Sequence, residues 1–271
     1  MPGRTYMSNS KLLFFDIDGT LLTPYPWKIP ESARTALKEA QKNGHKLFIN
    51  SGRTYAMIPD KIKELNFDGY VCGCGSQIYM DGKLLLSSSN PHELCVETID
   101  ILRKCKIPAF FECPDRILYD GSSAILPDAI QNLRTEVKVE DLSLYKEPLS
   151  KTFTFDKFLV FPRKDADMET FREFADRHFT RFVHADDAWE LTQKAYSKAT
   201  GIQFLMEYLE ESLEDTYAFG DSTNDLPMLK YAGTSIAMGL SDPAILPFCT
   251  WQTTDIEDNG IKNALEHFGL I

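Results

Sequence analysis

The chain has 271 residues, of which 43% are hydrophobic and 25% are charged, and its formal net charge at pH 7 is −11. This length and composition predict a globular protein with one large domain or two smaller ones. The negative charge argues against a surface for nucleic acid or for an anionic membrane, because both require a basic face. No apolar run approaches the roughly 20 residues of a membrane span.

The first residues of the chain and its cysteines bear on the cellular location of the protein. Residues 1–10 are polar and lack the apolar core of a secretory signal, so we expect a disordered leader. The six cysteines show no framework spacing for disulfides or metal, which predicts free, reduced and mostly buried thiols. A cytoplasmic location follows from reduced thiols.

The first predicted strand is an apolar run that ends in two acidic residues. Leu12–Phe15 has no polar alternation, as expected of a strand buried on both faces of a parallel sheet. Asp16 and Asp18 follow with one residue between them, so both carboxylates face one side if the chain stays extended. Gly19 then allows a sharp turn. The pair requires a cation, although an ordinary Asp-Gly turn is the competing interpretation.

Helices and strands alternate after this strand. The predicted order is a helix at 30–43, a strand at 46–50 that ends in Ser51-Gly52-Arg53-Thr54, a helix to about residue 65, and a strand at 70–72. Short connections between alternating strands and helices are typical of a doubly wound parallel sheet. We therefore predict an α/β fold for residues 11–82 together with 190–271.

The rhythm changes between residues 83 and 189. Predicted strands lie at 83–87, 109–113, 116–119, 153–161, 181–184 and 189–192, and helical patterns lie between them at 91–105, 124–136 and 165–179. The turn signals Asp81-Gly82 and Asp120-Gly121 predict antiparallel hairpins. We interpret 83–189 as an inserted α+β domain.

The first rhythm returns at Ser197. A helix places Ile202, Leu205 and Leu209 on one face, and a short buried strand at 216–220 follows it. That strand ends in Asp221-Ser222-Thr223-Asn224-Asp225. A helix with Pro227 in its first turn, a strand at 234–238 and a closing helix at 260–268 complete the prediction.

Polar residues collect at the ends of the predicted parallel strands, in four clusters: Asp16 with Asp18, Ser51-Gly52-Arg53, Lys198, and Asp221 with Asn224 and Asp225. Three of these clusters follow apolar strands directly, so they can converge on the carboxyl edge of one sheet, where open α/β sheets bind ligands. Each alone is compatible with a turn, a capped loop or a surface lysine. Their occurrence together favours a site.

These motifs, in this order, resemble those of the haloacid dehalogenase (HAD) superfamily, and more narrowly of the Cof-type phosphatases, which carry a large type IIB α/β cap between the second and third motifs. The insertion at 83–189 falls in that place. Two positions depart from the family pattern. Cys74-Gly75-Ser76 replaces the usual Asn-Gly-Ala, and no glycine directly follows Lys198, so Lys194 is a competing candidate.

The residue types suit hydrolysis of a phosphate monoester. Asp16 would be the nucleophile and form an aspartyl-phosphate. Asp18 would protonate the leaving oxygen and later deprotonate the attacking water. Mg²⁺ is the expected metal, because it takes oxygen ligands from one or two carboxylates plus the substrate phosphate. The resemblance implies that these ligands are the Asp16 carboxylate, the Asp18 backbone carbonyl and Asp221, with Asp225 acting directly or through a water.

The resemblance also implies how phosphate is held. The donors would be Ser51, the N–H groups of Ile17 and Gly52, and the fixed cation Lys198. Asn224 would support the site or touch the phosphate. Arg53 would position the substrate, or else stabilise the following helix or pair with a carboxylate.

We therefore predict a Mg²⁺-dependent phosphatase of a small phosphorylated metabolite, with a sugar phosphate as the first expectation. Its only expected partner is that metabolite, without nucleic acid or membrane, and we expect a monomer or a weak homodimer. A phosphomutase of the same superfamily is one alternative. A catalytically silent sugar-phosphate-binding regulator is the other, although the presence of both Asp16 and Asp18 argues against it.

Overall fold

The computed structural model describes residues 10–24, 26–120, 139–141, 152–183 and 188–271. Residues 1–9 of the predicted leader and the predicted helix at 124–136 lie outside this description. The chain forms two compact units. The core unit comprises Met1–Ser51, Lys63–Tyr70 and Lys198–Ile271, and the insertion unit comprises Gly52–Ile62 and Val71–Ser197.

The core unit is built on parallel strands, in the order β14-β13-β12-β1-β2. Their bounds are β1 Leu12–Phe15, β2 Lys46–Asn50, β12 Thr216–Gly220, β13 Thr234–Ala237 and β14 Trp251–Gln252. β3, Gly69–Cys72, and the short helix α2, Asp60–Lys63, each run across the division of the chain between the units. A helix follows β1, and α6 precedes β12, so the predicted α/β alternation is confirmed.

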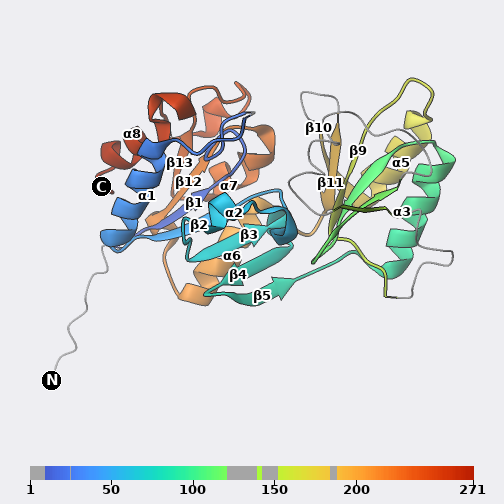
Figure 1. The fold of residues 1–271 in the computed structure, drawn as a ribbon, viewed down its shortest axis with the longest axis horizontal. Helices are drawn as coiled ribbons and strands as arrows, with labels where there is room; N and C mark the ends of the chain where they lie inside the picture. The colour runs from blue at the N-terminus through green and yellow to red at the C-terminus, as the bar shows by residue number, and fades with distance from the viewer. Residues whose placement is uncertain (1–9, 25, 121–138, 142–151, 184–187) are drawn as a thin grey trace. The chain divides into compact units, whose positions relative to one another are not determined.

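Four helices of this unit cover its strands: α1 Glu31–Lys42, α6 Lys198–Leu209, α7 Leu226–Tyr231 and α8 Gly260–His267. α1 and α8 lie side by side, and α6 and α7 lie on the other side of the strands (Figure 1). Each buries one face: α1, for example, buries Ala33, Ala36, Leu37 and Ala40. This is the doubly wound arrangement that places strand ends at one edge.

β1 is an inner strand of this sheet. All four of its residues are fully buried, and it pairs in parallel with β2 and with β12. The ring of Phe14 stacks on that of Phe48 with centroids 4.9 Å apart, and the ring of Phe15 stacks on that of Phe219 at 4.4 Å. Stacked aromatic pairs add about 0.5–1.5 kcal/mol each beyond the area that they bury. The strand therefore gives Asp16, its next residue, a rigid base.

The insertion unit is an α+β unit. Its elements are β4 Gln77–Met80, β5 Lys83–Ser87, α3 His92–Lys104, β6 Ala109–Glu112, β7 Ile117–Asp120, β8 Val139–Asp141, β9 Lys157–Val160, α5 Met168–His178, β10 Phe179–Val183 and β11 Trp189–Gln193. Six of the strands form a sheet in the order β10-β11-β9-β6-β7-β8. α3 and α5 cover one face of it, through a core that includes Ile99, Phe111, Phe158 and Phe171 (Figure 1).

The opposite face of this sheet receives a segment from near the start of the chain. Met57, in the 3₁₀ helix η1 (Tyr55–Met57), packs with Phe110, Ile117 and Tyr119. Phe110 and Phe111 are neighbours in β6 and point to opposite faces, as the alternation of a strand requires. The residues that follow Ser51 are thus bound to the insertion unit.

Several predicted elements need correction. The single helix predicted after Thr54, to about Leu65, is wrong: η1 and α2 occupy this stretch, and Ile58 between them is extended. Pro59 explains the interruption, because the residue before a proline is pushed out of the helical region. β4, β8 and β14 were not predicted. The compact insertion unit includes more of the chain than residues 83–189. The limits 83–189 for the inserted domain stay a prediction.

The hairpin predictions have mixed outcomes. β4 and β5 pair antiparallel around Asp81-Gly82, as predicted. Gly121 and the residues up to 138 lie outside the described residues, so the turn at Asp120-Gly121 stays a prediction. The next described strand, β8, pairs with β7 in parallel. All six cysteines are free and five are buried. Within the described part of the chain, no helix has both the length and the apolar character needed to cross a membrane.

Candidate active site

Asp16 stands at the carboxyl end of β1 and begins a tight turn. Its N–H donates to the carbonyl of Phe219, which continues the β1–β12 pairing for one more residue. The carbonyl of Ile17 then accepts hydrogen bonds from the N–H groups of Leu21 and Leu22, at 2.9 and 2.7 Å. The Asp16 side chain is buried, whereas Asp18, inside the turn, is exposed.

Lys198 brings the third motif to Asp16. It is the first residue of α6, and its Nζ lies 2.6 Å from Asp16 Oδ1 and 2.5 Å from Asp225 Oδ1. The competing candidate Lys194 instead donates to the backbone carbonyls of Asp176 and Arg177. The geometry therefore places Lys198, and not Lys194, against the predicted nucleophile.

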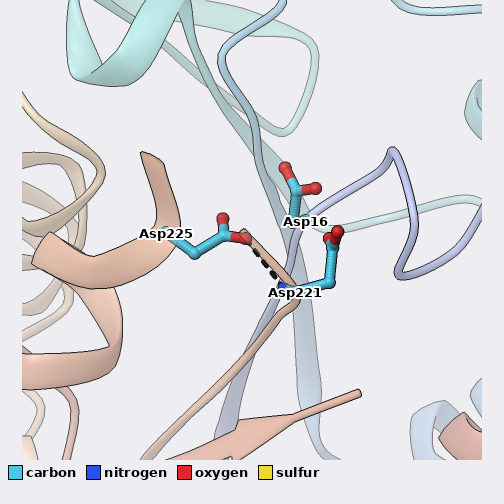
Figure 2. Close-up of side chains that lie close together, drawn as sticks. All are labelled: Asp16, Asp221 and Asp225. Atoms are coloured by element: carbon cyan, nitrogen blue, oxygen red, sulfur yellow. Dashed lines mark hydrogen bonds between the residues drawn. The ribbon is translucent and has the colours of Figure 1, made fainter. Parts of the chain in front are cut away.

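The loop after β12 is organised by Asp225. Its Oδ2 accepts from the backbone N–H groups of Asp221 and Ser222, at 2.9 and 3.0 Å, while its Oδ1 holds Lys198. The side chain is fully buried. Figure 2 shows the Asp225 carboxylate directed at the backbone of Asp221, which frees the Asp221 side chain to point toward the same region as Asp16.

Negative charge exceeds positive charge among these groups. Burial raises the pKa of Asp16 well above its usual value. Lys198 lowers this pKa, but the negative charges of Asp225, Asp221 and Asp18 raise it further. Burial, together with Asp225, raises the pKa of Asp221 to about 7. Carboxyl groups whose pKa is raised by other carboxylates are typical of sites that bind a cation or transfer protons.

The donor set fits a hard divalent cation. One carboxylate oxygen each from Asp16, Asp221 and Asp225 lie within 4.8 Å of one another, and Figure 2 shows the three side chains close together. Oxygen-only ligation by carboxylates is the preference of Mg²⁺ and Ca²⁺. Asp18 is expected to contribute only its backbone carbonyl, and that role stays a prediction. These residues could hold a metal ion.

The predicted phosphate-binding residues lie in both units. Ser51 is buried directly after β2. Gly52 begins the insertion-unit segment, where Arg53 Nη1 donates to the carbonyl of Met57 at 3.2 Å. Asn224 Oδ1 lies 3.4 Å from Lys198 Nζ. Their roles toward phosphate remain predictions. In place of the α-helix predicted after Thr54, the 3₁₀ helix η1 begins at Tyr55.

Two supporting residues escaped the sequence prediction. Asn50, the fully buried last residue of β2, donates through Nδ2 to the backbone carbonyl of Lys198 at 2.9 Å and so anchors the first turn of α6. Thr20 donates to Asp221 Oδ1 at 3.2 Å. For Asn50, the available signal in the sequence was a polar residue at the end of an apolar strand. For Thr20, it was the position directly after Asp18-Gly19.

The core unit is a parallel α/β sheet with acidic residues and a lysine at its carboxyl edge. Comparison with known families identifies the class of hydrolase to which such a chain belongs. A family model for haloacid dehalogenase-like hydrolases matches residues 13–265. The chain belongs to this family. Relatives that align over almost the whole chain are named as phosphatases, and it is an enzyme of that kind, a HAD-type phosphatase.

Two relatives and one solved structure illustrate the similarity. “Putative phosphatase YkrA” of Bacillus subtilis strain 168 is 28% identical over 266 residues, which cover 97% of this chain and 99% of that protein. The 5-amino-6-(5-phospho-D-ribitylamino)uracil phosphatase YitU of the same strain is 27% identical over 274 residues, covering 96% and 98%. The structure of the HAD subclass IIB sugar phosphatase BT4131 matches with a TM-score of 0.82 and 24% identity, covering 97% of this chain and 100% of that one.

Proposed function

We propose that the protein is a Mg²⁺-dependent phosphatase of a small phosphorylated metabolite, and that it works through an aspartyl-phosphate on Asp16. One observation carries the proposal: the buried Asp16 carboxylate touches Lys198 within a cluster that holds more carboxylates than cations. Such a cluster can attract a metal ion and a phosphate group together, since the metal neutralises the carboxylates and the lysine attracts the phosphate.

In the first step, a carboxylate oxygen of Asp16 attacks phosphorus while the bond from phosphorus to the ester oxygen breaks. Asp18 gives its proton to the departing alkoxide, and its exposure is compatible with reaching a leaving group. In the second step, water attacks the phosphorus of the aspartyl-phosphate and gives a proton to Asp18. Orthophosphate leaves and both carboxyl groups return to their first state.

The surrounding residues position the phosphoryl group and balance its charge. Lys198 is held by two carboxylates and by the anchored start of α6, so it offers a fixed cation to the transferring oxygens. Ser51 and the N–H groups of Ile17 and Gly52 are proposed to donate to the same oxygens, with Asn224 and Arg53 in supporting and substrate-positioning roles. Asp16, the Asp18 carbonyl, Asp221 and Asp225 would hold Mg²⁺, which when bound polarises the phosphoryl oxygens.

The substrate is proposed to be a sugar phosphate or a related small phosphate ester. The relative YitU is named for a substrate whose phosphate sits on a ribityl chain. Because that relative aligns over almost the whole of both chains, a substrate of similar size and chemistry is a reasonable proposal. We also propose a cytoplasmic protein, monomeric or weakly dimeric, whose six free thiols suit a reducing compartment.

The direct test is a panel of sugar phosphates and other phosphate esters, assayed with and without Mg²⁺. We expect release of orthophosphate that depends on Mg²⁺ and falls at least about 10⁴-fold in Asp16→Asn, because the nucleophile is lost. Asp215→Asn is the matched control, since its carboxylate also pairs with a lysine, Lys11, but at the surface of the same unit. Hydrolysis that survives metal removal or Asp16→Asn would overturn the mechanism.

The same panel separates the alternatives. A phosphomutase would interconvert hexose phosphates without releasing orthophosphate. A silent regulator would bind the ester and leave it intact.

Asp18→Asn tests the proton transfer separately. Loss of a general acid slows poor leaving groups most, so we expect a larger fall in kcat/KM with an alkyl phosphate than with a nitrophenyl phosphate, by about tenfold or more. Equal losses with both esters would count against this role.

A further inference from the structure

The insertion unit contains a second buried lysine with two carboxylates. Glu112 in β6 and Lys157 in β9 stand directly opposite each other in the antiparallel pairing of these strands, so their side chains share one face of the sheet. Glu190, in β11, joins them from the neighbouring strand. Glu112 also shares a face with Phe110, which packs against Met57, so the cluster lies on the face turned away from α3 and α5.

These three charges are fully enclosed. Their exposed fractions are 2% for Glu112, 4% for Lys157 and 3% for Glu190. Lys157 Nζ contacts Glu190 Oε1 directly and lies 3.3 Å from Glu112 Oε1. Burial alone would lower the pKa of Lys157, but the two carboxylates raise it above its usual value, so this lysine stays charged.

Lys157 and Glu112 also form hydrogen bonds with the segment that follows Ser51. Lys157 Nζ donates to the carbonyl of Gly52 at 2.7 Å. Glu112 Oε2 accepts from both the backbone N–H and the hydroxyl of Thr54, each at 2.9 Å. The peptide groups on both sides of Arg53 are therefore fixed by buried charged groups.

Gly52 is also fitted closely to the cluster. A Cβ placed on Gly52 would lie 2.8 Å from Glu190 Oε1, closer than real Cβ atoms approach such an oxygen. The absence of a side chain lets the backbone lie directly on the carboxylate and the lysine. Glu190 thus sets the position of Gly52 from one side while Lys157 holds its carbonyl.

Stability alone does not account for this cluster. Buried ion pairs stabilise little relative to well-packed apolar residues of similar size, because the desolvation cost offsets most of the attraction. Hydrogen bonds from charged groups are, however, short and directional, and they fix geometry well. The backbone groups that Lys157 and Glu112 bind here belong to Gly52 and Thr54, which flank Arg53 in the second motif.

We propose that Glu112, Lys157 and Glu190 are positioning residues that hold the Gly52–Thr54 backbone in its phosphate-binding conformation. The inference rests on the proposed function, in which Ser51 and the Gly52 N–H bind phosphate. The cluster touches no substrate itself. It fixes the direction of donors that must be in place before phosphate arrives, which is how preorganised sites gain affinity.

The test compares Glu112→Gln with Asp120→Asn. Both variants exchange a buried, ion-paired carboxylate for an amide in the same sheet, but Asp120 pairs with Arg103 of α3, on the face opposite the cluster. Binding of orthophosphate in the presence of Mg²⁺ is measured by calorimetry, and kcat and KM with the best ester of the panel. We expect about tenfold weaker phosphate binding and a raised KM in Glu112→Gln, and less than a twofold change in Asp120→Asn.

Thr54→Val provides a second variant that keeps the shape of the side chain. It removes the hydroxyl bond to Glu112 and leaves the N–H bond, so we expect about threefold weaker phosphate binding. Hydrogen exchange at the Thr54 amide should become faster in Glu112→Gln than in wild type and unchanged in Asp120→Asn.

Phosphate affinity that changes no more in Glu112→Gln than in Asp120→Asn, with both variants folded, would overturn the inference. Failure of the proposed function looks different: the wild-type protein would then release no orthophosphate from any ester. Orthophosphate binding and Thr54 exchange do not need turnover, so they test the cluster in either case.

Discussion

Among the residues that the structure describes, two lysines are buried, Lys198 and Lys157. Each is held between two carboxylates, and the two clusters differ in what surrounds them. In the core unit, Lys198 contacts Asp16 and Asp225, and a further carboxylate, Asp221, lies close by. In the insertion unit, Lys157 contacts Glu112 and Glu190. There the further partners include backbone and hydroxyl groups of Gly52 and Thr54 and the thiol of Cys74.

The difference lies in which charges are satisfied. Around Lys198 the pKa values of Asp16 and Asp221 are raised, chiefly by burial and then by the neighbouring carboxylates, so this cluster is incomplete without a cation. Around Lys157 the pKa of the lysine itself is raised, against the effect of burial, and the Glu112 carboxylate accepts two hydrogen bonds from Thr54. An incomplete cluster is suited to binding and chemistry, and a complete one to holding a backbone in place.

Replacing each lysine by methionine should give the largest difference between the two clusters. Lys198→Met and Lys157→Met both leave two buried carboxylates without their partner, so each should lower the free energy of unfolding of metal-free protein by about 3–5 kcal/mol. We expect kcat to fall about 10³-fold in Lys198→Met, which loses the transition-state cation, but only about tenfold in Lys157→Met. Urea unfolding and steady-state kinetics measure both. Equal losses of kcat would remove the distinction between the clusters.

Two glycines allow a milder test of the same distinction. A Cβ on Gly19, whose φ is +82°, would lie 2.4 Å from Asp221 Oδ2, and one on Gly52 would lie 2.8 Å from Glu190 Oε1. Gly19→Ala should therefore displace a metal ligand and raise the Mg²⁺ concentration for half-maximal activity by about tenfold. Gly52→Ala should instead raise the KM for the ester by about tenfold at an unchanged Mg²⁺ requirement. Titrations of Mg²⁺ and of ester for each variant decide between these outcomes; the reverse pattern would contradict the assignment.

The smallest expected effect is a dependence of metal stabilisation on pH. The pKa of Asp221 is about 7 in the folded protein against 3.8 ordinarily, so its protonated form stabilises the metal-free fold fully below about pH 4. That contribution is lost as pH rises through about 7. Mg²⁺ must displace the proton, so its stabilisation should be larger at pH 8 than at pH 5.

At a Mg²⁺ concentration about a hundred times its Kd, the expected stabilisation at pH 8 is about 2.7 kcal/mol, or roughly 5–10 °C in Tm. A clearly smaller shift is expected at pH 5. Thermal unfolding with Mg²⁺ or EDTA measures it, and Asp221→Asn should abolish the shift at both values. A Tm shift that does not depend on pH would mean that no carboxyl group with a raised pKa binds a proton in competition with the metal.

Much of the core unit could be predicted from the sequence because local patterns and the fold agree there. Leu12–Phe15 has the uninterrupted apolar run of a buried parallel strand, and the structure has β1 at these residues. Parallel strands end at one edge, so the proximity of Asp16 and Asp221 followed from the strand positions, whereas Lys198 was expected there from the family resemblance. The geometry then brings them together within hydrogen-bonding or ligand distance.

The second cluster could not be predicted, because its members are single charges in separate strands. Glu112, Lys157 and Glu190 each stand beside apolar residues and form no motif, and only the strand order β11-β9-β6 brings them together. The one local signal was a charged residue within or at the end of an apolar strand. The segment after Arg53 was misjudged for a similar reason: its conformation depends on Pro59 and on contacts of Met57 with a distant sheet.

The most direct test of the account is to look for the covalent intermediate on Asp16. A reaction with the best ester of the panel and Mg²⁺ is quenched in acid during turnover, digested, and analysed by mass spectrometry. The account predicts a phosphoryl group on the peptide that contains Asp16, absent without Mg²⁺ and absent in Asp16→Asn. Turnover with no such peptide, or with the phosphoryl group on another residue, would contradict it.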